Sequence, residues 1–101
     1  MAGDITVEEL KKRLDQNETI LIIDVREPHE FNEYSITELN IPLGVLSQRL
    51  WDFDEHMDNE IVVFCRSGSR SASAKMILTQ AGFSNVRNLT GGILSWMEKY
   101  S

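Results

Sequence analysis

The chain has 101 residues, of which 42% are apolar and 26% charged, a composition typical of one folded domain. Its formal net charge of −6 argues against a nucleic-acid partner, and no apolar run is long enough to cross a membrane. The single cysteine excludes an internal disulfide and, with no secretory signal at the N-terminus, leads us to expect one domain over residues 1–101 in the cytoplasm.

Short apolar strands and amphipathic helices alternate along the chain. In chain order we expect a helix over 7–15, a strand over 20–23, a short helix over 27–34, an extended piece over 40–42, a helical segment over 43–50, a strand over 61–64, a helix over 70–81, a weaker strand over 86–89 and a helix after residue 92. The first helix starts with the capping-box pattern of Thr6 and Glu9. This order predicts an α/β fold with a short, mainly parallel sheet of about five strands and helices on both faces.

Cys65 lies between a buried strand and a helix, at the sheet edge where ligands bind in parallel α/β folds. Gly68 and the neighbouring serines allow the loop to curl and turn its N–H groups inward as an anion-binding nest. Such N–H groups lower the pKa of a thiol and make it a nucleophile. We therefore expect a catalytic Cys65 with substrate-binding contacts from Arg66, Ser67, Gly68, Ser69 and Arg70.

Three further residues are expected to support this loop. Ser71 could cap the following helix or donate a hydrogen bond to the sulfur. Asp24 lies at the end of the other buried strand, and with Arg26 it is expected to form an ion pair or hydrogen-bond network rather than to act on substrate. For Arg70, bonding to a carboxylate or to loop carbonyls and contact with substrate remain equal alternatives.

The spacing in the loop bears on the reaction. Phosphatases with a cysteine nucleophile carry an arginine six positions after it, whereas here Ser71 is at that position and Arg70 is at the fifth. One residue fewer gives a tighter cradle, which suits a single sulfur atom better than a phosphoryl group. A cysteine phosphatase or arsenate reductase is therefore the less favoured alternative.

Three segments together resemble the rhodanese-like sulfurtransferase family. They are residues 22–31, the loop 63–72 and the closing segment 81–96, which stand in the family's order and cover nearly the whole chain. The resemblance implies that Cys65 takes a sulfane sulfur from a donor such as thiosulfate, becomes a persulfide, and passes the sulfur to a thiophilic acceptor such as cyanide. It also implies that no metal or organic cofactor is needed.

The segment from Tyr34 to Asn40 departs from the family pattern. The family usually shows Gly-His-Ile-x-Gly-Ala here, whereas this segment is shorter and lacks the glycines and the histidine. In this respect the chain is similar to rhodanese domains attached to adenylylating enzymes that serve ubiquitin-like sulfur carriers. A protein sulfur donor or acceptor is therefore a possible partner, and a non-catalytic binding module is the main alternative function.

Other notable side chains have ordinary explanations. His29 and His56 lack partners at metal-ligand spacing, so no metal site is expected. Aromatic residues 51 and 53 are assigned to the core, with the entrance of the active site as the alternative; Trp96 and Met97 are also assigned to the core. The acidic residues between 52 and 60 are interpreted as solvated surface, with a basic docking partner as the alternative.

Overall fold

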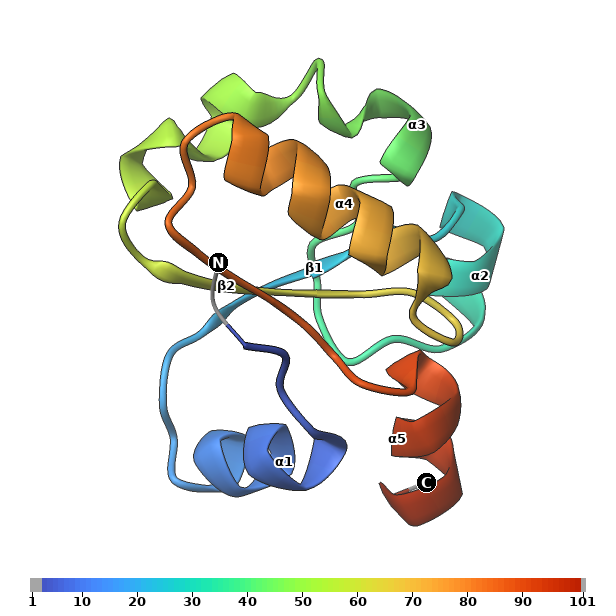
Figure 1. The fold of residues 1–101 in the computed structure, drawn as a ribbon. Coiled ribbons are helices and arrows are strands. Elements are labelled where there is room, and N and C mark those ends of the chain that lie inside the picture. Colours follow the sequence, from blue (N-terminus) through green and yellow to red (C-terminus); the bar gives the residue numbers. More distant parts are fainter. Residues whose placement is uncertain (1–2, 101) are drawn as a thin grey trace.

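The computed structural model describes residues 3–100, in which short strands alternate with helices (Figure 1). In chain order the elements are α1 (Val7–Asp15), β1 (Leu21–Asp24), α2 (Pro28–Glu33), α3 (Leu43–Leu46), the 3-10 helix η1 (Leu50–His56), β2 (Glu60–Phe64), α4 (Ser69–Gln80), β3 (Asn85–Asn88) and α5 (Gly92–Tyr100). Thr6 caps α1 as expected, because its hydroxyl accepts the Glu9 N–H at 3.1 Å. The α/β fold expected from the sequence is confirmed.

The sheet has three parallel strands in the order β1-β2-β3, not the five or so that the sequence predicted. The two outer positions are occupied by single-residue bridges, Ile5 beside Leu89 and Asn40 beside Asp24. Both outer segments leave the sheet at once, because Thr6 caps α1 directly after Ile5, and Pro42 caps α3 two residues after Asn40. The extended piece expected over 40–42 thus lies at one edge of the sheet, and the expected number of strands was too high.

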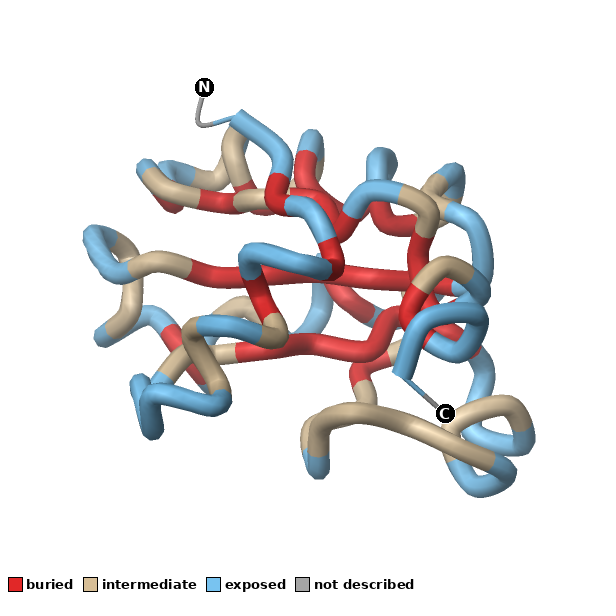
Figure 2. Tube along the Cα trace, turned by 90° about the horizontal axis from the view of Figure 1, so that it is seen from below, coloured by how far each residue is buried: buried red, intermediate tan, exposed pale blue. Residues whose placement is uncertain are grey.

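The sheet separates two apolar clusters. Alternate residues of β2 point to opposite faces, so Ile61 and Val63 join one cluster while Val62 and Phe64 join the other. Figure 1 shows α3, η1 and α4 on one side of the sheet and α1 and α5 on the other, and Figure 2, seen from the side of α1 and α5, shows that the strands are buried. Helices on both faces explain why β1 and β2 each contain a continuous run of apolar residues.

The chain over residues 43–56 differs from the helical segment predicted over 43–50. It divides into α3 and the 3-10 helix η1, and the backbone at Phe53 is not helical (φ −142°, ψ 30°). In a 3-10 helix, residues three apart share a face, so Leu50 and Phe53 pack inward while Trp51 is 81% exposed. The assignment of Trp51 to the core is therefore wrong, whereas that of Phe53 is confirmed.

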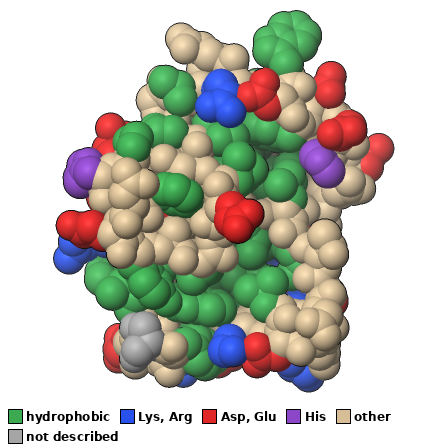
Figure 3. Space-filling model, turned by 180° about the vertical axis from the view of Figure 1, so that it is seen from behind, with side chains coloured by type: hydrophobic (Ala, Val, Ile, Leu, Met, Phe, Trp, Pro, Cys, Tyr) green, Lys and Arg blue, Asp and Glu red, His purple; other side chains and the backbone are tan. Residues whose placement is uncertain are grey.

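Exposed hydrophobic side chains are spread over several elements. Trp96 is buried as expected, but Met97 is 40% exposed because it lies on the outer side of α5. Seen from behind, hydrophobic side chains lie between charged ones (Figure 3). Within residues 3–100, none of the helices has the length and hydropathy required to cross a membrane.

Candidate active site

The chain reverses direction directly after Cys65, because the loop curls between the end of β2 and the start of α4. Gly68 has a φ of +118°, a value that glycine adopts without strain, and its N–H donates to Cys65 Sγ at 3.1 Å. The whole Cys65 residue is only 1% exposed. A short loop thus holds the sulfur at the carboxyl end of the central strand, as the sequence predicted.

Hydrogen-bond donors surround the sulfur of Cys65. The Ser71 hydroxyl lies 3.4 Å from Sγ. Burial raises the pKa of the Cys65 thiol, but hydrogen bonds from the Ser71 side chain and from the backbone N–H groups of Ser71, Gly68 and Ser67 more than offset this and leave the pKa below its ordinary value of 9.0. A lowered pKa increases the fraction of thiolate, which is the nucleophilic form.

The two loop arginines have different surroundings. Arg70 forms a bidentate pair with Glu30, at 2.7 and 3.0 Å, and the hydrogen bond from Arg70 holds the pKa of Glu30 at about 2. The Arg70 guanidinium therefore faces a carboxylate of the protein itself rather than an open position for substrate. Arg66 is exposed and forms no ion pair within residues 3–100; it borders a recess of about 260 Å³ beside α2 and α5. Ser67 and Ser69 are exposed at the loop surface.

Asp24 and Arg26 form the ion pair expected from the sequence. Arg26 Nη2 and Nε donate to the Asp24 carboxylate at 2.7 and 2.9 Å, and both residues are buried. The divergent segment closes over this pair: Arg26 also donates to the Tyr34 carbonyl at 2.6 Å, and the Ser35 hydroxyl donates to Asp24 at 2.9 Å. These contacts hold the end of β1, and none of them reaches the sulfur.

Gly92 and the N-terminus of α5 pack against the backbone carbonyls of the cysteine loop. The sequence analysis did not predict this contact. The N–H groups of Ile93 and Leu94 donate to the carbonyls of Cys65 and Arg66 at 2.9 and 3.1 Å. A Cβ atom on Gly92 would lie 2.4 Å from the Arg66 carbonyl oxygen, so only glycine permits this approach. The pair Gly91-Gly92 was the available signal, although sequence alone does not show which segment it faces.

Asn88, at the end of β3, is the second residue that was missed. It is a buried polar side chain, and it bonds both the Gly68 carbonyl and the Ser71 hydroxyl. In the sequence, an asparagine at the end of a strand is a weak signal, because it occurs at many strand ends without any contact to a site.

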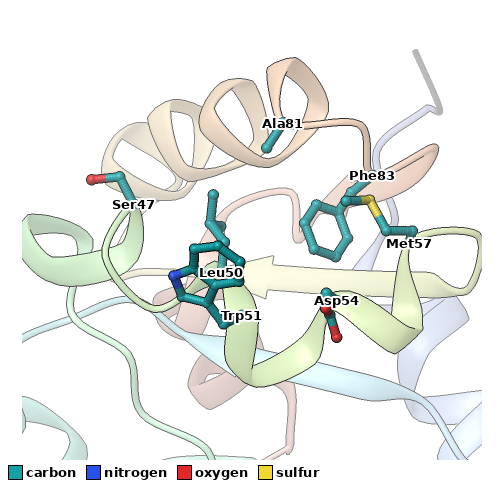
Figure 4. A pocket seen from close by; sticks show the side chains of 7 residues that line it. All are labelled: Ser47, Leu50, Trp51, Asp54, Met57, Ala81 and Phe83. Atoms are coloured by element: carbon teal, nitrogen blue, oxygen red, sulfur yellow. The ribbon is translucent and has the colours of Figure 1, made fainter.

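The other expectations concern metals and aromatic residues. Residues 3–100 contain no group of three or more potential metal ligands among histidine, cysteine, aspartate and glutamate side chains. Trp51 does not line the active-site entrance. It borders a cavity of about 310 Å³ together with Ala81 and Phe83, at the C-terminal end of α4, whereas the cysteine loop lies at the N-terminal end of that helix (Figure 4).

The acidic residue Glu60 was interpreted as part of a solvated surface, but it forms ion pairs with Arg13 and Arg87.

Comparison with known proteins identifies the family. The sequence model of the rhodanese-like domain matches residues 6–99. A sulfurtransferase of Allochromatium vinosum is 36% identical over 95% of this chain and 89% of its own length. The Zea mays adenylyltransferase and sulfurtransferase MOCS3-2 is 36% identical over 91% of this chain, which spans only 20% of that larger protein. The structure of the human single-domain sulfurtransferase TSTD1 superposes with a TM-score of 0.86 and 26% identity, covering 100% of both chains. With its α/β fold and the cysteine loop described above, the chain belongs to the rhodanese-like domain family.

Proposed function

We propose that the protein is a sulfurtransferase in which Cys65 carries the sulfur as a persulfide. The observation that carries the proposal is the position of Cys65 Sγ, which faces the Gly68 N–H at 3.1 Å and the Ser71 hydroxyl at 3.4 Å. These donors would stabilise a negative sulfur, whether it is the thiolate or the outer sulfur of a persulfide. The sulfurtransferase names of the relatives support the same activity.

The reaction proceeds in two displacement steps. The Cys65 thiolate attacks the outer sulfur of thiosulfate, the S–S bond of thiosulfate breaks, and sulfite leaves with the electron pair. Cyanide then attacks the outer sulfur of the persulfide, thiocyanate leaves, and the Cys65 thiolate is restored. Each step forms one bond to sulfur and breaks one, so no external oxidant or reductant is required.

Phosphoryl transfer is less well supported by this geometry. A phosphatase needs a cationic group directed at the substrate oxygens, and the Arg70 guanidinium is instead held by Glu30 in a bidentate pair. Arg66 is the loop arginine left to attract an anionic donor at the rim of the site. A tight loop with its N–H groups turned inward fits a single sulfur atom.

The donor and acceptor are proposed by chemical class. Thiosulfate and cyanide are the small-molecule pair, and a protein persulfide or a protein sulfur acceptor is the alternative partner. A Bacillus subtilis relative that is 34% identical is named a putative sulfur carrier protein, which supports a protein partner as the second possibility. The lone cysteine fits a reducing compartment, and on that ground the proposed location is the cytoplasm.

Intact-protein mass measurement tests the proposal. Wild type and Cys65→Ser are incubated with thiosulfate and then with cyanide. We expect wild type alone to gain the mass of one sulfur atom and to lose it to cyanide. Since Cys65 is the only cysteine, the adduct has one possible thiol site.

A persulfide donor protein provides the second arm of this experiment. If neither thiosulfate nor a cysteine desulfurase with its substrate loads sulfur onto folded wild type, the sulfurtransferase proposal is wrong and a binding module becomes the better account. Sulfur transfer by Cys65→Ser at the wild-type rate would also overturn the mechanism.

A further inference from the structure

Asn88 lies beneath the sulfur-carrying loop and contacts it with both ends of its amide group. It is the last residue of β3, pairs with Val63 of β2 and is only 8% exposed. Its Nδ2 donates to the Gly68 carbonyl at 3.0 Å, and its Oδ1 accepts from the Ser71 hydroxyl at 2.6 Å. The carbonyl can only accept a hydrogen bond, which fixes the orientation of the amide.

The Gly68 carbonyl oxygen already has two donors. The N–H of Ala72 and Nδ2 of Asn88 both reach it at 3.0 Å, which uses its two lone pairs. Ser71 Oγ is also 3.2 Å from this oxygen, but it has only one proton to donate. That proton is therefore shared between Asn88 Oδ1, at 2.6 Å, and Cys65 Sγ, at 3.4 Å.

These distances allow two hydrogen-bond arrangements. When Cys65 is a thiol, the Ser71 hydroxyl donates to Asn88 Oδ1 and offers a lone pair to the S–H group. When the sulfur is negative, the hydroxyl rotates and donates to it, and Asn88 Oδ1 loses that donor. The strength of Asn88 as an acceptor therefore determines how readily Ser71 turns toward the sulfur.

We propose that Asn88 is a positioning residue that holds the Gly68 peptide with its Nδ2 and the Ser71 hydroxyl with its Oδ1, and so controls how strongly these donors stabilise negative charge on Cys65. The proposal rests on the proposed function of Cys65 as the sulfur carrier and adds a residue that directs its hydrogen-bond donors. Asn88 itself does not touch the sulfur.

Two ion pairs also belong to this environment. Asp4 accepts the Asn88 N–H at 3.2 Å and pairs with Lys75 of α4 at 2.7 Å. On the rim of the loop, Arg70 is paired with Glu30. Neither ion pair includes the Asn88 side chain, but Asp4 bonds the backbone N–H of the same residue, so a carboxylate at position 88 would add a second negative charge near Asp4.

Asn88→Asp is the informative substitution because it keeps the size of the side chain. The aspartate loses the donor to Gly68 and becomes a stronger acceptor for the Ser71 proton, and both effects disfavour the thiolate. We expect the pH at which Cys65 is half alkylated by iodoacetamide in a fixed time to rise by about one unit, which corresponds to about tenfold slower alkylation at a pH below the pKa of the thiol. Alkylation reports on Cys65 alone, since no other cysteine is present.

The same substitution is made in a Ser71→Ala background. If the Ser71 hydroxyl transmits part of the effect, the shift caused by Asn88→Asp is smaller in that background, and the two substitutions are not additive. Asn85→Asp is the matched control, because it adds the same charge at the other end of β3 and should leave the alkylation profile unchanged. A merely structural role for Asn88 would change stability without this coupling.

Repulsion between Asp4 and a carboxylate at position 88 could prevent folding. In that case Asn88→Asp is combined with Asp4→Asn, which keeps an amide oxygen opposite the Asn88 N–H, and the shift is measured against Asp4→Asn alone. A shift no larger than that of Asn85→Asp, or one of equal size with and without Ser71, overturns the proposal. Alkylation needs no sulfur donor, so this result is independent of the persulfide mass test.

Discussion

The conformation of Gly68 is the backbone feature on which the geometry around the sulfur depends. Its φ of +118° turns its N–H toward Cys65 Sγ, while a Cβ atom at this position would meet nothing closer than Asn88 Nδ2 at 3.9 Å. Space is therefore available for a side chain, and only the backbone conformation opposes it.

Gly68→Ala is expected to lower the free energy of unfolding by about 1–2 kcal/mol, the cost of a left-handed conformation for a residue with a Cβ. If the loop relaxes to relieve that cost, the N–H moves away from Sγ and alkylation of Cys65 near neutral pH slows. Chemical denaturation and the alkylation rate measure the two effects. Gly44→Ala is the control, because Gly44 lies in α3 with open space around it and should change neither quantity unfavourably. Equal effects of both substitutions would refute the argument.

The sequence was sufficient for residues whose surroundings are local. Cys65, Gly68 and Ser71 lie within seven positions of each other, so the end of a strand, a tight turn and a helix start already define their geometry. Gly92 of α5 and Asn88 of β3 were missed because they contact the loop from elements that are distant in the sequence, and a linear pattern does not show such contacts. The sequence left two alternatives for Arg70, a structural bond and contact with substrate, because its partner Glu30 is also distant in the sequence.

At the scale of elements, the approach of α5 to the loop depends on Gly92. Its φ is +62°, and a Cβ atom would lie 2.4 Å from the Arg66 carbonyl oxygen and 2.6 Å from that of Cys65. Both contacts are to backbone, which cannot rotate away as a side chain does. Gly92→Ala therefore must displace the N-terminus of α5 or the loop.

We expect Gly92→Ala to destabilise the fold by about 3 kcal/mol, from overpacking added to the left-handed conformation. We also expect slower alkylation of Cys65, because the donors to the carbonyls of Cys65 and Arg66 move. Gly82→Ala separates the two causes: Gly82 also has a positive φ, of +106°, but its nearest contact is the flexible Met57 side chain at 3.4 Å. Similar losses of stability in both variants would show that the close contact at Gly92 contributes nothing.

The elements themselves differed in how well the sequence predicted them. The strands β1 and β2 and the helix α4 were placed within one or two residues. The two strands are short apolar runs, and α4 was predicted from the helical spacing of Ala74, Ile77 and Leu78 and from the glycine that follows it. The number of strands was overestimated, since the extended piece expected over 40–42 forms only a single-residue bridge at Asn40 before Pro42 caps α3, and the other edge likewise has only a single-residue bridge, at Ile5. The 3-10 helix η1 was missed because its period of three differs from the α-helical period that was sought.

At the scale of the whole molecule, a network of charges joins α1 to the sheet at the end opposite Cys65. Glu60 at the start of β2 accepts from Arg13 of α1 at 2.7 Å and from Arg87 of β3 at 3.0 Å, and Arg87 also bonds Glu9 of α1. Hydrogen bonds from Arg13 are the main reason why the pKa of Glu60 lies below its ordinary value of 4.5, against the opposing effect of burial.

This network predicts how the stability of the fold depends on acid. A carboxyl group whose pKa is lower in the folded chain contributes stability that is complete above its ordinary pKa, here 4.5, and is lost as the pH falls through the lowered folded value. Glu60→Gln should therefore unfold at a lower temperature than wild type at pH 7, and the difference between the two melting temperatures should shrink as the pH falls below 4.5. Glu33→Gln removes the same charge from an exposed side chain with no ion pair within residues 3–100, so its melting temperature should stay close to that of wild type across this range. Melting curves of the three proteins between pH 7 and the acid limit of reversible folding measure this. A difference between wild type and Glu60→Gln that stays constant through the acid range would mean that packing, and not the ion pairs of Glu60, joins α1 to the sheet.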